Sequence, residues 1–369
     1  MTDSRWQLLR EWPPGYGGIE RVAHEMATFW RAPVFSLDAQ NLSRASHQDG
    51  SDPLPVVYPR TRLHGLKLGR LIVPVPSWSL CRILRSPAPL HGHLPSPGVL
   101  LILLLARCCR PKRIVSAHWH AFLESGADRT FSLFLMYQRL ALLVLPHLSE
   151  VVTTSPVLAD ELVKAGCSAS KVRVLSCCLD QSFEREALGL PLKKDADSPL
   201  RVLFIGRLES YKRLDWLIAA LATLKSPWRL DVVGDGPRRD DFEYQAQGLP
   251  VHFQGRLNEA GKLRQLAAAD VLVLPSDRSN EAFGIVQLEA MAAGVPTLAF
   301  SRHRSGMGWV GSLPGLSWSQ TPGELSDVLA RLASDRELRS LLRFQARDRY
   351  LRLFSRAVWM SQMRAWSRF

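Results

Sequence analysis

Two glutamates, Glu281 and Glu289, stand eight positions apart in the segment NEAFGIVQLEAMAAG at residues 280–294. The apolar, alanine-rich run after Gly284 predicts a buried helix. At the start of such a helix, free N–H groups and the positive end of the helix dipole favour a negatively charged ligand such as a diphosphate. Gly284 has no side chain and permits close approach of that ligand. The segment therefore predicts an anion site beside two carboxylates.

Two cations lie at the end of an apolar strand predicted over residues 200–208. Arg207 ends the run IGR, and Lys212 follows five residues later. Arginine and lysine at the end of a strand suit the charge of a diphosphate. Two solvated surface charges would have the same spacing, so the pair alone leaves both interpretations open.

Glycines mark turns where a ligand could approach the backbone. Gly17 and Gly18 precede an amphipathic segment, Gly206 follows an apolar strand, and Gly234 lies in VVGDGP. In open parallel sheets, ligands bind beside loops at the carboxyl ends of strands. A simple turn would explain each glycine equally well.

Two histidines, His118 and His120, flank Trp119 at the end of a strand predicted over 113–120. A histidine near a strand is more often structural than functional. His120 lies further toward the loop, which slightly favours it as a ligand-facing residue.

The chain has 369 residues, a formal net charge of +13, 46% hydrophobic residues and 22% charged residues. The length predicts about two domains, and the composition is that of a packed globular protein. The positive charge predicts an anionic partner: nucleic acid, a phosphorylated metabolite or an anionic membrane.

No segment has the pattern of a secretory signal or a transmembrane helix. Asp3 and the lack of an apolar block behind it favour a cytoplasmic protein. The apolar run 98–106 is about half the length of a span and predicts a buried helix or strand, and the run 133–145 predicts a half-buried helix. The six cysteines include no C-x-x-C pair, so reduced thiols and no metal site are expected.

Strand and helix patterns alternate along the chain, which predicts parallel sheets covered on both faces. The polar segment 190–199 predicts a boundary between domains at 1–192 and 193–369. Proline is dense between residues 53 and 97, where a loop with a few short elements is expected. The predicted strands cover residues 113–120, 150–155, 171–176, 200–208, 229–236, 251–255 and 270–276, and the clearest helices cover 155–166 and 213–224.

These motifs occur together and in a specific order: GGIERV, GRLESYKRLDWLIAAL, VVGDGP, FQGRL and AAADVLVLPSDRSNEAFGIVQLEAMAAGVPTLA. The sequence resembles the retaining, nucleotide-sugar-dependent glycosyltransferases of family 4. Their GT-B fold has two Rossmann-like domains with parallel sheets facing across a cleft. The resemblance covers about residues 15–300 and is densest over 201–299. The E-x7-E arrangement with its FG pair is its most specific part.

The resemblance implies roles for the residues above. Glu281 would meet hydroxyls of the transferred sugar, Glu289 would accept the ribose hydroxyls, and a histidine would face the sugar. Arg207 and Lys212 would hold the departing diphosphate. The implied catalytic set is Glu281, Arg207, Lys212, His120 and His118, and the implied donor-binding set is Gly17, Gly18, Gly206, Gly234, Phe283, Gly284, Ile285 and Glu289.

The sequence departs from the family pattern at two places. CCLD keeps only Asp180 of a common Asn-Gly-x-Asp turn, and the segment after Ala299 has no clear counterpart of a Gly-Gly and acidic turn that helps to hold the donor. The donor's base and sugar therefore stay open.

The implied function is metal-independent sugar transfer with retention, from a nucleotide-diphosphate sugar to a glycan or lipid-linked acceptor. Surface polysaccharide or lipopolysaccharide synthesis at the cytoplasmic face of a bacterial membrane is the expected setting, with no cofactor. A sugar-nucleotide epimerase of the GT-B fold is one alternative. A basic nucleic-acid-binding protein is another, but only the net charge supports it, so no nucleic-acid partner is predicted.

The segment from Arg331 to Phe369 has ten arginines and three acids, together with Trp359 and Trp366. Basic and aromatic residues together suit an anionic headgroup region. A helix whose apolar face packs back on the N-terminal domain would explain the last ~25 residues equally well.

Overall fold

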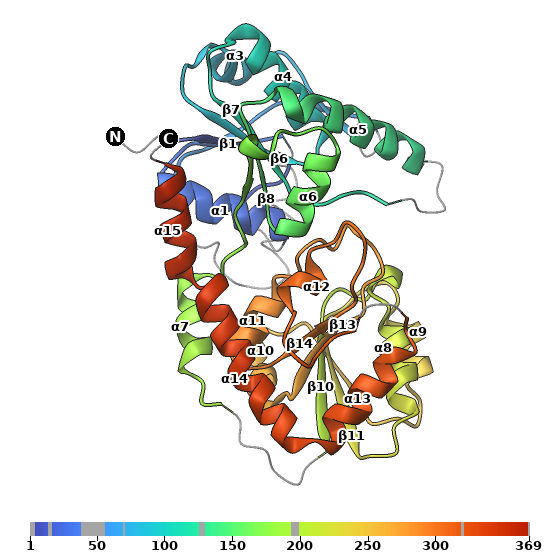
Figure 1. Ribbon diagram of the computed structural model, residues 1–369. Helices are drawn as coiled ribbons and strands as arrows, with labels where there is room; N and C mark the ends of the chain where they lie inside the picture. The colour runs from blue at the N-terminus through green and yellow to red at the C-terminus, as the bar shows by residue number, and fades with distance from the viewer. Residues whose placement is uncertain are drawn as a thin grey trace. The chain divides into compact units, whose positions relative to one another are not determined.

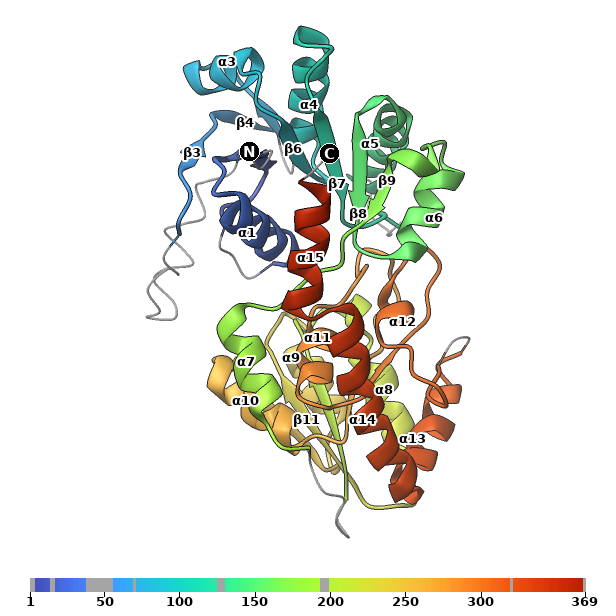
Figure 2. The ribbon, with the colours of Figure 1, turned by 60° about the vertical axis from the view of Figure 1, so that its left-hand side comes forward.

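The computed structural model describes residues 4–13, 17–37, 56–68, 71–124, 130–192, 199–318 and 321–367. Contacts divide the chain into two compact units, one of Met1–Ser176 with Ser361–Phe369 and one of Cys177–Met360. The predicted boundary after residue 192 is later in the chain than this division. Each unit is an α/β layer structure with a parallel sheet between helices (Figures 1 and 2).

The first unit is built on a seven-stranded sheet in the order β3-β2-β1-β6-β7-β8-β9, in which all neighbouring strands are parallel. The predicted strands over 113–120, 150–155 and 171–176 correspond to β7, β8 and β9. The elements are β1 (Trp6–Leu9), α1 (Gly18–Trp30), β2 (Val34–Ser36), β3 (Arg60–Arg62), β4 (Gly65–Leu68), β5 (Leu71–Pro74), α3 (Trp78–Arg85), β6 (Leu90–Leu94), α4 (Pro97–Cys109), β7 (Val115–Trp119), α5 (Thr130–Val144), η1 (Leu145–His147), β8 (Glu150–Thr153), α6 (Pro156–Lys164), η2 (Ala169–Lys171) and β9 (Val172–Val174).

The proline-dense region contains more regular structure than the sequence predicted. Its described part holds β3, the antiparallel β4–β5 pair, α3 and the central strand β6. The prolines fall at the edges of these elements: Pro74 ends β5 and Pro97 opens α4, where the missing N–H costs nothing. The strand β6 has the sequence LHGHL, whose histidines and glycine lack the apolar, β-branched signature of a buried strand.

The second unit is built on a five-stranded parallel sheet in the order β12-β11-β10-β13-β14. Four of its strands were predicted, and the short β14 was not. The elements are α7 (Gln181–Gly189), β10 (Leu200–Ile205), η3 (Ser210–Lys212), α8 (Leu214–Ala222), β11 (Trp228–Val233), α9 (Arg239–Gln245), β12 (Val251–Gly255), α10 (Glu259–Ala268), β13 (Val271–Leu274), α11 (Val286–Ala292), β14 (Thr297–Ala299), α12 (Met307–Val310), α13 (Glu324–Ser334) and α14 (Arg336–Leu353), followed by α15 (Arg356–Trp366), whose last turns belong to the first unit.

The two apolar runs form α4 and α5. The half-buried helix predicted over 133–145 is confirmed, whereas the run 98–106, predicted to be buried, also exposes Leu101 and Leu105 on α4. Among the described residues, no helix combines the length and the hydropathy that a bilayer crossing requires. The six cysteines are unpaired thiols, also as predicted.

The end of α15 is anchored inside the first unit. The Trp366 indole is fully buried, donates to Glu150 Oε2 at 2.9 Å and lies 4.4 Å from the Arg5 guanidinium. Arg5 itself pairs with Glu150. The aromatic end of this basic segment therefore fills the protein interior.

Candidate functional site

An ion pair between Lys212 and Glu281 lies at the carboxyl end of the second sheet. Lys212 ends η3, in the loop after β10, and its side chain is largely buried. Its ammonium donates to Glu281 Oε2. Burial by itself would lower the pKa of Lys212, but the adjacent Glu281 carboxylate outweighs burial, so the pKa is raised. The site therefore keeps a desolvated cation at neutral pH.

Arg207 lies in the same loop, but its side chain is 68% exposed and pairs with Glu209 at 3.1 Å. Burial raises the pKa of Tyr211, and the charges of Lys212, Glu281, Glu209 and Arg207 act on the same phenol. The Lys212 ammonium lies 5.4 Å from the centre of the Tyr211 ring. The structure pairs Lys212 with Glu281 and Arg207 with Glu209, so each cation of this loop lies beside an acid.

Gly206 and Gly234 are neighbours at the ends of β10 and β11. Gly206 N donates to Val233 O at 3.0 Å, and Gly234 N donates to Gly255 O at 2.8 Å. Gly234 has φ +134°, and a Cβ there would lie 1.9 Å from the Gly206 carbonyl oxygen. A Cβ on Gly206 would meet nothing closer than 3.5 Å. Of these two positions, only 234 requires a glycine for the chain to pack. At Gly206 there is room for a side chain beside the end of β10.

The turn before α11 also requires a glycine. Gly284 has φ +69°, and a Cβ there would meet Gln287 Nε2 and Leu274 Cδ1 at 3.2 Å. Phe283 is buried, and Ile285 caps the helix, which begins at Val286. The helix thus begins two residues after Gly284, close to the predicted start. Glu281 lies on the loop before this turn, where its carbonyl accepts from Ser305 Oγ at 2.7 Å.

Glu289 lies inside α11 and is almost completely buried. Its Oε1 accepts from Lys262 Nζ at 2.9 Å, and Lys262, on α10, also lies 4.9 Å from the Phe183 ring. A carboxylate at this depth requires a partner of opposite charge. Lys262 was missed by the sequence analysis, because no motif links two residues that are 27 positions apart.

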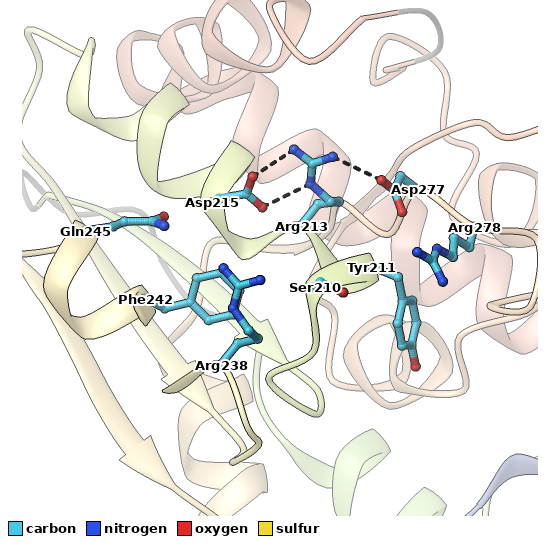
Figure 3. Close-up of a pocket in the computed structure, with 9 residues that line it drawn as sticks. All are labelled: Ser210, Tyr211, Arg213, Asp215, Arg238, Phe242, Gln245, Asp277 and Arg278. Carbon is cyan, nitrogen blue, oxygen red and sulfur yellow. Dashed lines mark hydrogen bonds and ion pairs between the residues drawn. The ribbon is translucent and has the colours of Figure 1, made fainter. Parts of the chain in front are cut away.

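A pocket of about 230 Å³ in the second unit is lined in part by Ser210 and Tyr211, which precede Lys212 in η3 (Figure 3). Figure 3 shows the Arg213 guanidinium between Asp215 and Asp277, which it contacts at 2.7 and 3.1 Å. Arg213 has φ +50° and packs 3.9 Å from the Trp216 ring. Arg213 therefore pairs with both carboxylates of the pocket.

The remaining predicted residues lie in the first unit. Gly17 caps α1 and Gly18 opens it. The Glu20 carboxylate folds back on this end of the helix, 2.1 Å from where a Cβ on Gly17 would lie. Burial raises the pKa of Glu20. In this structure the helix start is therefore occupied by the chain's own acid.

His118 and His120 stack with ring centroids 4.1 Å apart. His118 lies inside β7 and is fully buried, whereas His120 directly follows the strand and is 8% exposed. Burial lowers the pKa of both imidazoles well below the usual value, so both are neutral at pH 7. Of the two, His120 is the one at the carboxyl end of the sheet.

Two family models match the chain and together span most of it. The model of the glycosyl transferases group 1 matches residues 191–349, and the model of glycosyltransferase family 4 matches residues 16–183. The chain belongs to the family 4 glycosyltransferases. The group 1 model covers the predicted site residues of the second unit from Gly206 to Glu289, and the family 4 model covers those of the first unit from Gly17 to His120.

Curated relatives of this glycosyltransferase include the sulfoquinovosyl transferase SQD2 of Arabidopsis thaliana, 27% identical over 69% of the chain and 52% of the relative. The D-rhamnosyltransferase WbpZ of Pseudomonas aeruginosa is 27% identical over 77% of the chain and 73% of the relative. The chain thus spans about half the length of the first relative and about three quarters of the second.

Solved structures confirm the GT-B fold predicted from the resemblance. The Anabaena protein Alr3699/HepE in complex with UDP superposes with a TM-score of 0.76 at 18% identity, over 99% of this chain and 100% of that one. The lipopolysaccharide outer core galactosyltransferase WaaB has a TM-score of 0.70 at 17% identity, over 99% and 100%. The nucleic-acid alternative, which rested on net charge alone, receives no support from this family.

The two glycines at the strand ends give a matched prediction for this glycosyltransferase. Gly234→Ala should lower the free energy of unfolding by at least about 2 kcal/mol, because its methyl group overlaps the Gly206 carbonyl at a positive φ. Gly206→Ala should change it by less than about 1 kcal/mol. Urea denaturation followed by fluorescence measures both, and equal losses would contradict the packing described here.

Proposed function

We propose that this glycosyltransferase moves a sugar from a nucleotide-diphosphate donor to a glycan or lipid-linked acceptor, with retention and without a metal ion. The Lys212–Glu281 pair carries the proposal, because it sets a desolvated cation against a carboxylate at the carboxyl end of a parallel sheet. The Anabaena protein has been solved with UDP and with UDP-glucose, which supports a nucleotide-sugar donor.

The departing diphosphate needs positive charge that is already in place. Lys212 supplies a cation whose surroundings exclude water, and Arg207 supplies an exposed one in the same loop. Fixed charges in a desolvated site stabilise developing negative charge without reorganisation. The proposed sequence is that the diphosphate approaches Lys212 beside the Gly206 loop, while Glu281 accepts hydroxyls of the sugar. In this arrangement the side chains replace a metal ion.

Glu289 is proposed to accept the ribose hydroxyls, with Lys262 holding its carboxylate in place. The contact at 2.9 Å fixes one carboxylate oxygen inside the unit. A hydroxyl acceptor that is already oriented loses little entropy when the ligand binds. Lys262 therefore acts on the donor through Glu289 in this proposal.

Retention is proposed because Glu281 is suited to binding rather than attack. Its carboxylate is paired with Lys212, which lowers its nucleophilicity, and it lies in the loop just before α11. With the diphosphate held by cations, departure can run ahead of attack, and the acceptor can enter on the face that the leaving group vacates. The departing phosphate oxygen then takes the acceptor's proton, so no protein base is needed.

Surface polysaccharide or lipopolysaccharide synthesis is the proposed setting, at the cytoplasmic face of a membrane. The names of two relatives, a D-rhamnosyltransferase and a lipopolysaccharide outer core galactosyltransferase, support glycans of this kind. An epimerase would need no second substrate, and no observation in the described structure favours one over transfer.

An anionic membrane is proposed as the surface on which the lipid-linked acceptor is met. Of the two interpretations left open for the C-terminal segment, inward packing holds for Trp359 and Trp366, because both are buried, at 3% and 0% exposure. The helix α5 offers an apolar stripe instead. Leu133, Met136, Leu140 and Leu143 follow one helical face with 55, 64, 55 and 70% exposure. Such a stripe on a protein of charge +13 suits the interface of an anionic bilayer.

Substitution of the two cations tests the donor site. A hydrogen bond to a charged group contributes about 1.5–3 kcal/mol, so Arg207→Ala and Lys212→Met should each lower kcat at least about tenfold. Arg352→Ala, at a similarly exposed arginine paired with Asp348, is the control and should transfer normally. Normal turnover and normal donor affinity for Arg207→Ala would remove Arg207 from the site.

Product stereochemistry tests the mechanism. Proton NMR of the first-formed product should show the same anomeric configuration as the donor. Mass spectrometry of the enzyme incubated with donor alone should show no sugar attached to Glu281. An inverted linkage, or a trapped adduct on Glu281, would overturn the mechanism.

Vesicle flotation tests the membrane contact. The protein should float with vesicles that contain phosphatidylglycerol, and added salt should weaken binding by screening. The double variant Leu140→Ser/Leu143→Ser should bind less, because about 0.8 kcal/mol is lost for each CH₂ no longer buried. Leu341→Ser removes an exposed leucine from α14 and should bind normally. Binding that ignores both salt and the α5 substitutions would contradict this account.

A further inference from the structure

Four buried histidines gather on one face of the first sheet. His91 and His93 lie on β6, His118 lies on β7, and His120 directly follows β7. Side chains two positions apart on a strand share a face, and the register places His93 opposite His118. Their rings pack within 4.1–5.6 Å of one another, centroid to centroid, for the contacts His91–His93, His91–His118, His93–His118, His93–His120 and His118–His120. The function proposed above gives none of them a role.

A chain of hydrogen bonds runs through this cluster from β1 to the end of β7. Gln7 Nε2 donates to the Arg5 carbonyl at 2.9 Å, which fixes the orientation of the amide. Gln7 Oε1 then lies 2.9 Å from His93 Nε2, and His93 Nδ1 lies 3.0 Å from His120 Nε2. The chain links three adjacent strands of the sheet.

The orientation of Gln7 assigns the proton on every ring of the chain. An amide oxygen can only accept, so His93 Nε2 carries the hydrogen. Burial lowers the pKa of His93 to about 3, so the ring is neutral and its Nδ1 is bare. His93 Nδ1 must therefore accept from His120 Nε2–H. His120 is neutral as well, which leaves its Nδ1 without a proton.

The remaining nitrogen of His120 is available to a ligand. His120 Nδ1 has no hydrogen-bond partner among the residues that the structure describes. The residue follows β7 directly, at the carboxyl end of the sheet, and is the most exposed of the four histidines. A bare imidazole nitrogen at this place can accept a hydrogen bond but cannot donate one.

We propose that Gln7 and His93 are positioning residues that hold His120 in the tautomer whose bare Nδ1 accepts a substrate hydroxyl. This inference rests on the proposed function, because it takes the hydroxyl to belong to the transferred sugar or its acceptor. A bare Nδ1 selects a substrate group that donates a hydrogen bond, such as a hydroxyl. The inference gives this role to His120 and not to His118, whose two ring nitrogens are buried without partners among the described residues.

A metal ion is the competing explanation of the cluster. Nitrogens of His91, His93 and His118 lie within 4.8 Å of one another. Both nitrogens of His93 are already engaged, by Gln7 and His120. A metal on His93 would have to displace either Gln7 or His120, so the hydrogen-bond chain describes the cluster better.

Nitrogen NMR of the protein labelled with ¹⁵N-histidine tests the tautomers directly, without an activity assay. His93 and His120 should both show a protonated Nε2 and a bare Nδ1, assigned by the loss of each signal in the variants below. Gln7→Met, of similar size, removes the acceptor and should release His93 from its single tautomer. A protonated Nδ1 on His120, or stoichiometric metal in the purified protein, would overturn the inference.

Transfer kinetics test the consequence. His93→Leu removes the acceptor for His120 and should lower kcat/KM roughly fivefold, the equivalent of about 1 kcal/mol for one hydrogen bond. His93→Asn places an amide oxygen near the position of Nδ1 and should restore most of that loss. His91→Leu is the matched control, with the same change on the same strand outside the chain, and should transfer normally.

The outcomes separate this inference from the function on which it rests. No transfer by the wild-type enzyme from any nucleotide sugar would count against the proposed function. The NMR experiment would still test the tautomers of His93 and His120, because it needs no activity. If the wild-type enzyme transfers normally and His93→Leu and His91→Leu lose equal amounts of kcat/KM, then His93 contributes only to packing and does not position His120. A thermal melting curve for each variant shows whether it is folded.

Discussion

The desolvated ammonium of Lys212 is the constraint on which the second unit's site depends. A buried cation without a partner would be too costly to keep, so Glu281 must lie against it. This contact ties the loop after β10 to the loop before α11, which lie far apart in the sequence. The Gly284 turn follows within a few residues, so its placement is linked to the same pair. In the proposed function, a diphosphate that reaches Lys212 would compete with Glu281 for the ammonium.

The two units handle polarity in different ways. The candidate site of the second consists of ion pairs, with Lys212 against Glu281 and Lys262 against Glu289. The first gathers neutral imidazoles, whose pKa values are lowered chiefly by burial. Charge holds and releases an anion, whereas a neutral hydrogen-bond chain orients a hydroxyl. A sugar nucleotide presents both kinds of group.

Much of the fold could be predicted from the sequence because its strands are apolar and β-branched. Strands β10, β11 and β13 have this pattern, and Gly206 and Gly234 mark the ends of β10 and β11. Strand β6 lacks it, because LHGHL owes its burial to tertiary partners: Gln7 from β1 and Ser116 from β7 bind His93 and His91 at 2.9 and 2.8 Å. The E-x7-E spacing could identify Glu281 and Glu289 as a pair of interest. It could not reveal Lys262, because the partner of a buried charge is set by proximity in the folded structure and not by a fixed separation in the sequence.

The burial of Trp366 has a consequence for how the protein is made. The indole contacts Arg5 and Glu150 and lies 5.1 Å from Trp30, ring to ring, so the first unit is completed by residues from near the other end of the chain. Domains generally fold as units, with the N-terminal one first during synthesis. Here the ribosome must translate the whole of the second unit before it reaches Trp366, which completes the core of the first unit. Until then Arg5 and Trp30 lack the Trp366 ring that packs against them.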